Sequence, residues 1–163
     1  MTFDELYAAH ADSVYSFLRY KIRDIHLVED IFQDTFLAVY QEMNRGRLPT
    51  HPKSWLLTIA HRRMVDRLRR VPTQEVILLM GEALEQRENM DFAQRLFFHE
   101  QLDRLEEACR TILYALYVEG MTIRETAQML GIPEGTVKSR SHTAKLKLSQ
   151  WMKEDEQADE SKP

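Results

Sequence analysis

The sequence predicts an all-α protein made of two small helical domains that a flexible linker joins. Its 163 residues include only 5 Gly and 5 Pro, fewer than a many-stranded sheet needs for its turns. Apolar residues recur every three or four positions at both ends of the chain, as in amphipathic helices. A polar, acidic stretch separates these parts. The predicted boundaries are 1–71 for the first domain, 72–95 for the linker, 96–153 for the second domain and 154–163 for a disordered acidic tail.

Two long helices are predicted to begin the first domain. Thr2 and Glu5 form a capping box at the start of a helix over residues 3–22, and Asp24 is placed to cap the next helix. The second helix carries a broad apolar stripe, consisting of Leu27, Val28, Ile31, Phe32, Phe36, Leu37, Val39 and Tyr40. Its other face is polar and acidic and consists of Glu29, Asp30, Gln33 and Asp34.

A third helix is predicted over residues 53–70, after a break at residues 44–52. The break contains Gly46, Pro49 and Pro52, which forbid a continuous helix. The expected inward residues of the third helix are Trp55, Leu56, Ile59, Ala60, Met64, Val65 and Leu68. The outward ones are His61, Arg62, Arg63, Arg67, Arg69 and Arg70, which together favour a phosphate-binding face.

The second domain is predicted to begin with two helices, over residues 92–105 and 106–119, with Gly120 ending the second. Apolar residues at core spacing support both helices and are Leu96, Leu102, Leu105, Ile112, Leu113, Leu116 and Tyr117. Cys109 lies in the second of these helices, where a small apolar filler is expected rather than a nucleophile.

A helix-turn-helix follows, and it is the most informative feature of the chain. Thr122 and Glu125 cap a helix over residues 123–130, and Gly131 supplies the residue that tolerates a positive φ at its end. Ala127 permits close crossing of the next helix, and Pro133 sets φ for its start. The second helix is predicted from Glu134 to about residue 153. This order of signals predicts duplex DNA as a partner.

The residues of the second helix separate into two sides. Val137, Ala144, Leu148 and Trp151 form the apolar side. Base edges and phosphates in the major groove would meet polar and basic side chains of the first turns. These candidate DNA contacts are Thr136, Lys138, Ser139, Arg140 and His142.

The net charge of −4 is distributed unevenly along the chain. Residues 1–71 carry 11 Lys and Arg against 9 Asp and Glu, and residues 111–153 carry 6 against 3. Residues 72–110 carry 4 against 9, and residues 154–163 carry 1 against 5. Because the bulk attraction to DNA is weak, we expect the free protein to bind DNA poorly unless a partner positions it.

Other classes of function lack their sequence signals. No apolar run approaches 18 residues, and the N-terminus lacks a secretory pattern, so we expect a soluble protein that is not inserted in a membrane. A single cysteine fits a reducing cytoplasm. The chain has no Walker-type loop, Gly-x-Ser-x-Gly or Cys-x-x-Cys motif, and none of its six histidines lies in the Glu-x-x-His pairing of a di-iron bundle. We therefore expect no enzyme, metal, cofactor or small-molecule substrate.

Three segments resemble successive signatures of the extracytoplasmic-function (ECF, group IV) sigma factors of bacterial RNA polymerase, in the sigma-70 family. They are Val28 to Tyr40 (VEDIFQDTFLAVY), Ser54 to Ala60 (SWLLTIA) with Asp66, Arg69 and Arg70, and Gly135 to Arg140 (GTVKSR). The resemblance covers about residues 3–150. It implies a bacterial, cytoplasmic initiation factor whose first domain is sigma region 2 and whose second is sigma region 4.

The resemblance also implies partners and residue roles. Core RNA polymerase would bind Asp30, Gln33, Asp34, Phe36 and Leu37. The minus-10 promoter element would meet Asn44, Lys53, Ser54, His61, Arg62, Arg63, Arg67, Arg69 and Arg70, with a base held by the loop at residues 44–54. The minus-35 element would meet Thr136, Lys138, Ser139, Arg140, His142, Thr143 and Lys145. The family makes an inhibitory anti-sigma factor a further expected partner.

The linker is too flexible to set the distance between the two promoter elements. A flexible chain of about 24 residues has a typical end separation of about 27 Å and a stretched limit of roughly 80 Å, against about 70 Å between the elements. The polymerase must therefore fix the spacing.

Two other functions stay open at this stage. A conventional helix-turn-helix regulator with an N-terminal dimerisation bundle would bind paired half-sites without polymerase. An adaptor that uses its helices only for protein contacts would show no salt-sensitive DNA binding.

Two departures from the family pattern predict altered promoter preference. His61 and Arg62 replace the usual Arg-Asn pair, whereas Ser141 replaces an apolar residue and Thr143 a basic one in the recognition helix. Because Thr143 lacks the charge and the donors of arginine, we expect a relaxed or altered preference at one or two minus-35 positions. A promoter selection that returned the ordinary family motif unchanged would contradict this expectation.

Overall fold

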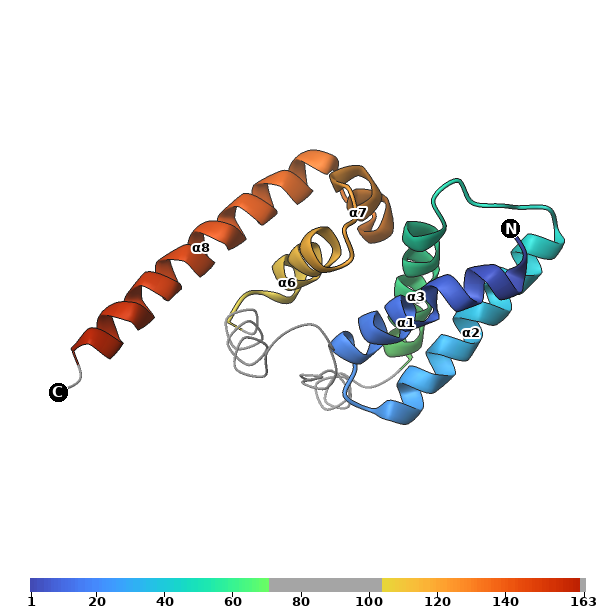
Figure 1. Ribbon diagram of the computed structural model, residues 1–163, viewed down its shortest axis with the longest axis horizontal. Helices are drawn as coiled ribbons and strands as arrows, with labels where there is room; N and C mark the ends of the chain where they lie inside the picture. Colours follow the sequence, from blue (N-terminus) through green and yellow to red (C-terminus); the bar gives the residue numbers. More distant parts are fainter. Residues whose placement is uncertain (71–103, 162–163) are drawn as a thin grey trace. The chain divides into compact units, whose positions relative to one another are not determined.

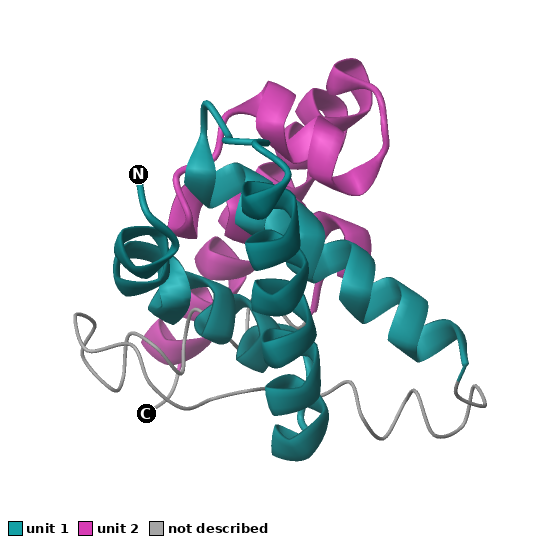
Figure 2. Ribbon diagram, turned by 90° about the vertical axis from the view of Figure 1, so that its right-hand side faces the viewer, with its two compact units in different colours: residues 1–86 teal, residues 87–163 magenta. Residues whose placement is uncertain are grey.

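The computed structural model describes residues 1–70 and 104–161, and the secondary structure of these residues is helical in both compact units. The units are residues 1–86 and 87–163 (Figure 2), so the boundary between them falls outside the described residues. The first unit contains α1 (Phe3–Lys21), α2 (Ile25–Asn44) and α3 (Pro52–Arg69). The second contains α6 (Glu107–Leu113), a π-helical segment (Tyr114–Val118), α7 (Ile123–Leu130) and α8 (Glu134–Glu160) (Figure 1). The described residues contain no strand, as the fold-class prediction requires.

The starts of α1 and α2 have the predicted caps. The backbone N–H of Glu5 donates to Thr2 Oγ1 at 3.2 Å, and the backbone N–H of Thr2 donates to Glu5 Oε2 at 2.8 Å. The latter hydrogen bond lowers the pKa of the Glu5 carboxyl. Asp24 Oδ1 accepts from the backbone N–H groups of His26 and Leu27, at 2.9 and 3.2 Å. These local bonds satisfy amide groups that a helix start leaves without intrahelical partners.

The three helices of the first unit surround one apolar core. Each helix contacts the other two. The fully or almost fully buried residues are Leu6, Val14, Phe17, Leu18, Ile22, Val28, Ile31, Phe36, Val39, Leu56, Leu57, Ala60 and Met64. The core differs from the prediction on α3, where Trp55 and Ile59 are only half-buried and Leu57 is fully buried. The inward stripe of α3 is thus rotated relative to the predicted one.

The helix predicted over residues 106–119 is present but contains a π-helical turn. α6 gives way after Leu113 to the π segment, and the backbone N–H of Glu119 donates to the carbonyl of Tyr114 at 3.1 Å. A π turn holds one more residue than an α turn, so the residues after it change their direction. Tyr114 and Ala115, at the start of this segment, are buried, whereas Tyr117 near its end is 58% exposed. The prediction of Tyr117 as a core residue is wrong for this reason.

The helix-turn-helix has the predicted geometry. Thr122 Oγ1 accepts from the backbone N–H of Glu125 at 3.0 Å, and Gly131 ends α7 in the left-handed conformation with φ +67°. Pro133 precedes α8 with φ −62°. Ile112, Ala127 and Val137 form the buried cluster under the turn, with Leu116, Ile123, Leu130 and Ile132 packed against it.

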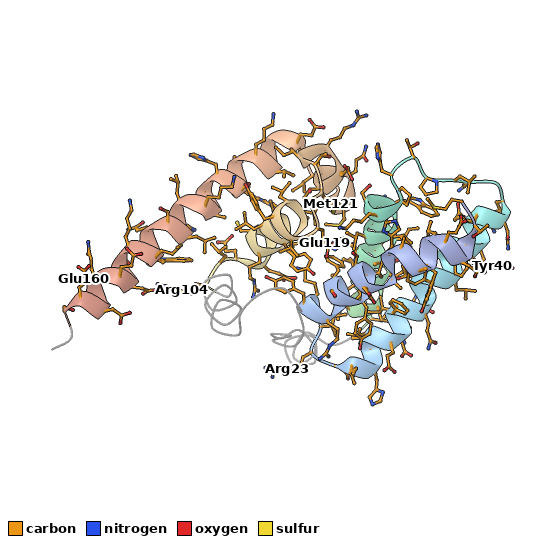
Figure 3. All side chains as sticks on the ribbon, viewed as in Figure 1. Arg23, Tyr40, Arg104, Glu119, Met121 and Glu160 are labelled. Carbon is orange, nitrogen blue, oxygen red and sulfur yellow. The ribbon has the colours of Figure 1, made fainter. Side chains whose placement is uncertain are left out.

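The prediction that residues 154–163 are a disordered tail is wrong for residues 154–160, because α8 continues to Glu160. Five of the seven residues from 154 to 160 are Glu, Gln or Ala, which favour helix even where no apolar face is buried. Local and tertiary contacts support this end of α8: Gln150 Nε2 donates to Glu154 Oε1 at 3.4 Å, and Asp155 Oδ2 lies 3.8 Å from Arg104 Nη1. Figure 3 shows side chains extending from α8 as far as Glu160.

Several sequence predictions lie outside the described residues. These are the linker at residues 72–95 and the helix at residues 92–105 as far as residue 103. Arg104 and Leu105 lie in a bend before α6, and Leu105 is buried.

Gly131 and Gly135 provide substitutions of opposite effect. An alanine Cβ would meet no atom within 4 Å at either position, but only Gly131 has a positive φ. We expect Gly131→Ala to destabilise the second unit by about 1–2 kcal/mol through backbone strain. Gly135→Ala should stabilise it by about 0.5–1 kcal/mol, because Gly135 lies within α8.

Amide hydrogen exchange of α7 and α8 in the full chain measures both changes. Equal shifts in the same direction for the two variants would contradict the assigned role of Gly131.

Candidate functional site

The first turns of α8 expose the predicted DNA-contacting side chains. Lys138, Ser139, Arg140, His142, Thr143 and Lys145 are exposed, and Thr136 is half-buried. Their positions cover more than half of the helix circumference, at about 100° per residue. The opposite side packs on α6 and α7 through the fully buried Val137 and Ala144. The fold therefore turns a polar and basic surface of α8 outward, as a recognition helix requires.

The two recognition-helix departures occupy different environments. Ser141 is 5% exposed and lies on the buried side of α8, between Val137 and Ala144. Thr143 is exposed among the candidate DNA contacts. Ser141 is therefore a packing position, whereas Thr143 is the departure on the exposed side of the helix.

Lys145 makes a contact that the sequence did not predict. Its Nζ lies 4.6 Å from the centroid of the Tyr117 ring, in cation–π geometry. The π-helical turn brings this ring outward, as described above. The contact orients the ammonium group beside the recognition turns without removing its charge.

The predicted acidic face of α2 is exposed and has an apolar residue among its acids. Asp30, Gln33 and Asp34 are exposed, and Leu37 is 57% exposed on the same side of the helix. Phe36 is buried instead, packing on Tyr7 with ring centroids 4.8 Å apart. Phe36 is therefore part of the apolar core beneath the acidic face, whereas Leu37 is part of the exposed face itself. The assignment of Leu37 to the inward stripe is wrong.

Tyr40 was also assigned to the inward stripe, yet it is 48% exposed. It lies near the C-terminal end of α2 (Figure 3), and its ring packs edge-on against Phe3 at 5.3 Å.

The outer face of α3 carries four exposed arginines. Arg62, Arg63, Arg69 and Arg70 lie within an arc of about 120° around the helix. Asp66 is exposed in the same arc. This stripe is basic overall and can bind phosphates.

Two predicted minus-10 contacts are turned toward the protein. Ser54 is buried, and its hydroxyl donates to the carbonyl of His51 at 3.2 Å, which ties the helix start together. His61 is half-buried beside Phe17, with ring centroids 6.4 Å apart. Ser54 therefore has a structural role in this fold, and its contact with the minus-10 element stays a prediction.

The break between α2 and α3 places polar and basic groups near the N-terminus of α3. Asn44 is exposed and Lys53 is half-buried. Burial and the nearby Lys53 ammonium lower the pKa of His10, which favours the neutral imidazole. Arg45 and Arg47, which the prediction did not include, pair with Glu42 at 3.0 and 2.7 Å.

Arg67 links the basic helix to the acidic one. Its Nη2 lies 3.2 Å from Asp30 Oδ2, and its Nη1 lies 3.5 Å from Asp34 Oδ2. The structure thus joins a predicted DNA contact to two predicted polymerase contacts.

Taken together, these surfaces define a helical DNA-binding protein with a helix-turn-helix in one unit and a mixed acidic and basic bundle in the other. Residues 6–71 match the model of sigma-70 region 2, and residues 98–148 match that of sigma-70 region 4. The chain belongs to the ECF sigma factors of the sigma-70 family. It is an alternative sigma factor that binds core RNA polymerase and directs transcription initiation at specific promoters. The conventional-regulator alternative is not favoured.

Relatives resemble the chain over most of its length. It is 31% identical over 155 residues to the ECF RNA polymerase sigma factor SigM of Mycobacterium tuberculosis (strain ATCC 25618 / H37Rv), covering 92% of this chain and 76% of the relative. It is 33% identical over 146 residues to the ferric citrate uptake sigma factor FecI of Escherichia coli (strain K12), covering 85% and 83%.

Solved structures share the fold. The sigma factor RpoE in complex with the anti-sigma factor NepR from Bartonella quintana matches with a TM-score of 0.74 at 19% identity, over 93% of this chain and 96% of that one. CnrH in complex with the cytosolic domain of CnrY matches with a TM-score of 0.62 at 24% identity, over 94% and 88%. Among residues 1–70 and 104–161, no helix combines the length and apolar character needed to cross a membrane.

Restoring the missing charge at Thr143 tests the DNA-facing side of α8. We expect Thr143→Arg to tighten promoter binding by the holoenzyme. The slope of log K against log salt should become more negative by about 1, as for one added phosphate contact. Binding titrations over a range of salt concentrations measure both effects.

Gln150→Arg is the matched control, because Gln150 is exposed on the same side two turns further along α8. Equal effects of the two variants would mean that Thr143→Arg acts through bulk charge alone.

Proposed function

We propose that the chain is a group IV sigma factor with three separate binding surfaces. The acidic face of α2 binds core polymerase, the arginine stripe of α3 with the preceding loop meets the minus-10 element, and the first turns of α8 read the minus-35 element. The observation that carries this proposal is the exposed Leu37 among Asp30, Gln33 and Asp34. Such a face offers a protein partner carboxylates that can pair with basic groups and one apolar side chain that can be buried.

The composition of the α2 face supports a polymerase contact rather than a DNA contact. Its carboxylates would repel phosphates, whereas they complement a basic protein surface. Leu37 would lose its contact with water in the complex and contribute apolar burial. Gln33 adds a side chain that can donate and accept hydrogen bonds.

The α3 surface supports a contact with promoter DNA near the point of melting. Arg62, Arg63, Arg69 and Arg70 supply four positive charges on one face, and none of them pairs with a carboxylate in the described part of the chain. Asn44, Lys53 and His61 flank this face in the proposal. A base drawn out of the duplex costs a few kcal/mol to unstack, and the surrounding cations would offset part of that cost.

The α8 surface supports reading of the minus-35 element in the major groove. Arg140 and Lys138 can donate to guanine edges or to phosphates, and Thr136, Ser139, His142 and Thr143 offer shorter polar groups. Lys145 adds a phosphate contact held beside Tyr117. Phosphate contacts would fix the orientation of the helix, and base contacts would give sequence preference.

The remaining assignments follow from family membership. An anti-sigma factor would hold the chain inactive by covering one or more of the three surfaces. The protein would act in the bacterial cytoplasm and perform no chemistry itself, because RNA synthesis belongs to the polymerase. Its net charge of −4 would keep unassisted DNA binding weak.

Transcription with purified components tests the whole proposal. The full chain is mixed with core RNA polymerase and a promoter library, and run-off transcripts are measured. We expect transcripts only when both proteins are present. Tight, palindrome-dependent DNA binding by the chain alone would contradict the proposal.

Leu37→Ala tests the role of α2. Because Leu37 is exposed, its truncation should leave the fold intact while weakening core binding by about 1–2 kcal/mol, or roughly 5- to 30-fold. Affinity is measured by titrating core polymerase into labelled chain.

Leu146→Ala is the control, because Leu146 on α8 is 58% exposed, almost the same as Leu37. A similar loss of core affinity in both variants would remove the special role of the α2 face.

A further inference from the structure

Arg67 contacts two carboxylates of the neighbouring helix at the same time. Each of its terminal nitrogens faces a different acid, Nη2 with Asp30 at 3.2 Å and Nη1 with Asp34 at 3.5 Å. Both contacts use Oδ2, and neither carboxylate makes another hydrogen bond or ion pair in the described part of the chain. The second oxygen of each acid thus remains available to a partner.

A bridging cation offsets the repulsion between the two carboxylates. Asp30 and Asp34 are four residues apart on α2, where like charges repel each other. A guanidinium is planar and has several donors in fixed directions, so it can hold two carboxylates in one geometry, whereas an ammonium is a single point of charge. The three side chains keep 40%, 57% and 49% exposure for Arg67, Asp30 and Asp34. The bridge therefore orders the acids without covering them.

We propose that Arg67 is a positioning residue of the polymerase-binding surface and not a contact of the minus-10 element. It holds the Asp30 and Asp34 carboxylates in the arrangement that the polymerase meets, so that less side-chain freedom is lost when the complex forms. This inference rests on the proposed function of α2. It separates Arg67 from the four other arginines of α3, whose charges remain directed to DNA.

The expected effect is small, because exposed ion pairs contribute little. We expect Arg67→Gln to weaken core binding about three- to fivefold. Arg67→Lys should restore only part of the loss. The salt dependence of promoter binding by the assembled holoenzyme should not change, because no phosphate contact is removed.

A double-mutant cycle with Asp34→Asn tests the bridge directly. Full-length variants are titrated with core polymerase, and their thermal unfolding is measured in parallel. If Arg67 acts by holding Asp34, the double variant should lose clearly less affinity than the two single variants predict when their effects are added. Arg23→Gln is the control, because it removes an exposed positive charge of the same unit outside the three proposed surfaces, and it should leave core affinity unchanged.

Three results would overturn the inference. Additive losses in the cycle would show that Arg67 acts independently of Asp34. Tighter core binding by Arg67→Gln would show that Arg67 competes with the polymerase for the acids. Unchanged core affinity with a salt slope reduced by about 1 would make Arg67 a promoter contact.

The same data distinguish failure of this inference from failure of the proposed function. If Asp34→Asn alone leaves core affinity unchanged, the α2 face is not the polymerase-binding surface. If Asp34→Asn weakens core binding and Arg67→Gln does not, only the role of Arg67 fails.

Discussion

Burial of one apolar core by α1, α2 and α3 decides which faces of these helices meet water, and both the acidic face of α2 and the arginine stripe of α3 depend on it. Once Val28, Ile31 and Val39 turn inward on α2, its acids must lie outside. Burial of Leu57, Ala60 and Met64 likewise leaves the arginines of α3 outside. The core thus sets acidic and basic surfaces on adjacent helices, close enough for Arg67 to join them.

The second unit exposes the polar and basic side of α8 from a small apolar core. The left-handed Gly131 and the buried Ala127 bring α7 and α8 close together, and Val137 fills the space between them. The π turn before α7 follows the buried Leu113 and directs Tyr117 outward, where its ring meets Lys145. A departure from regular helix therefore serves both packing and presentation of a charged side chain.

Local signals explain what the sequence predicted well. Capping by Thr2, Asp24 and Thr122, and the turn at Gly131, depend on residues a few positions apart, so helix starts and the helix-turn-helix could be identified directly. Features that depend on tertiary packing could not be identified from the sequence. The exposure of Leu37 depends on where the other helices lie, and Arg67 meets Asp30 across 37 positions of sequence. The end of α8 was missed because a polar composition was taken to mean disorder, although its residues favour helix.

The length of α8 has a consequence for how this protein can be observed. At 1.5 Å per residue its 27 residues extend about 40 Å as one continuous helix, so Glu160 lies roughly 22 Å beyond Lys145. A fluorophore or spin label placed at that end would share the orientation of the turns that face DNA. Its distance to a second probe on the promoter would report how the helix tilts as the bubble opens, without any modification of the interface.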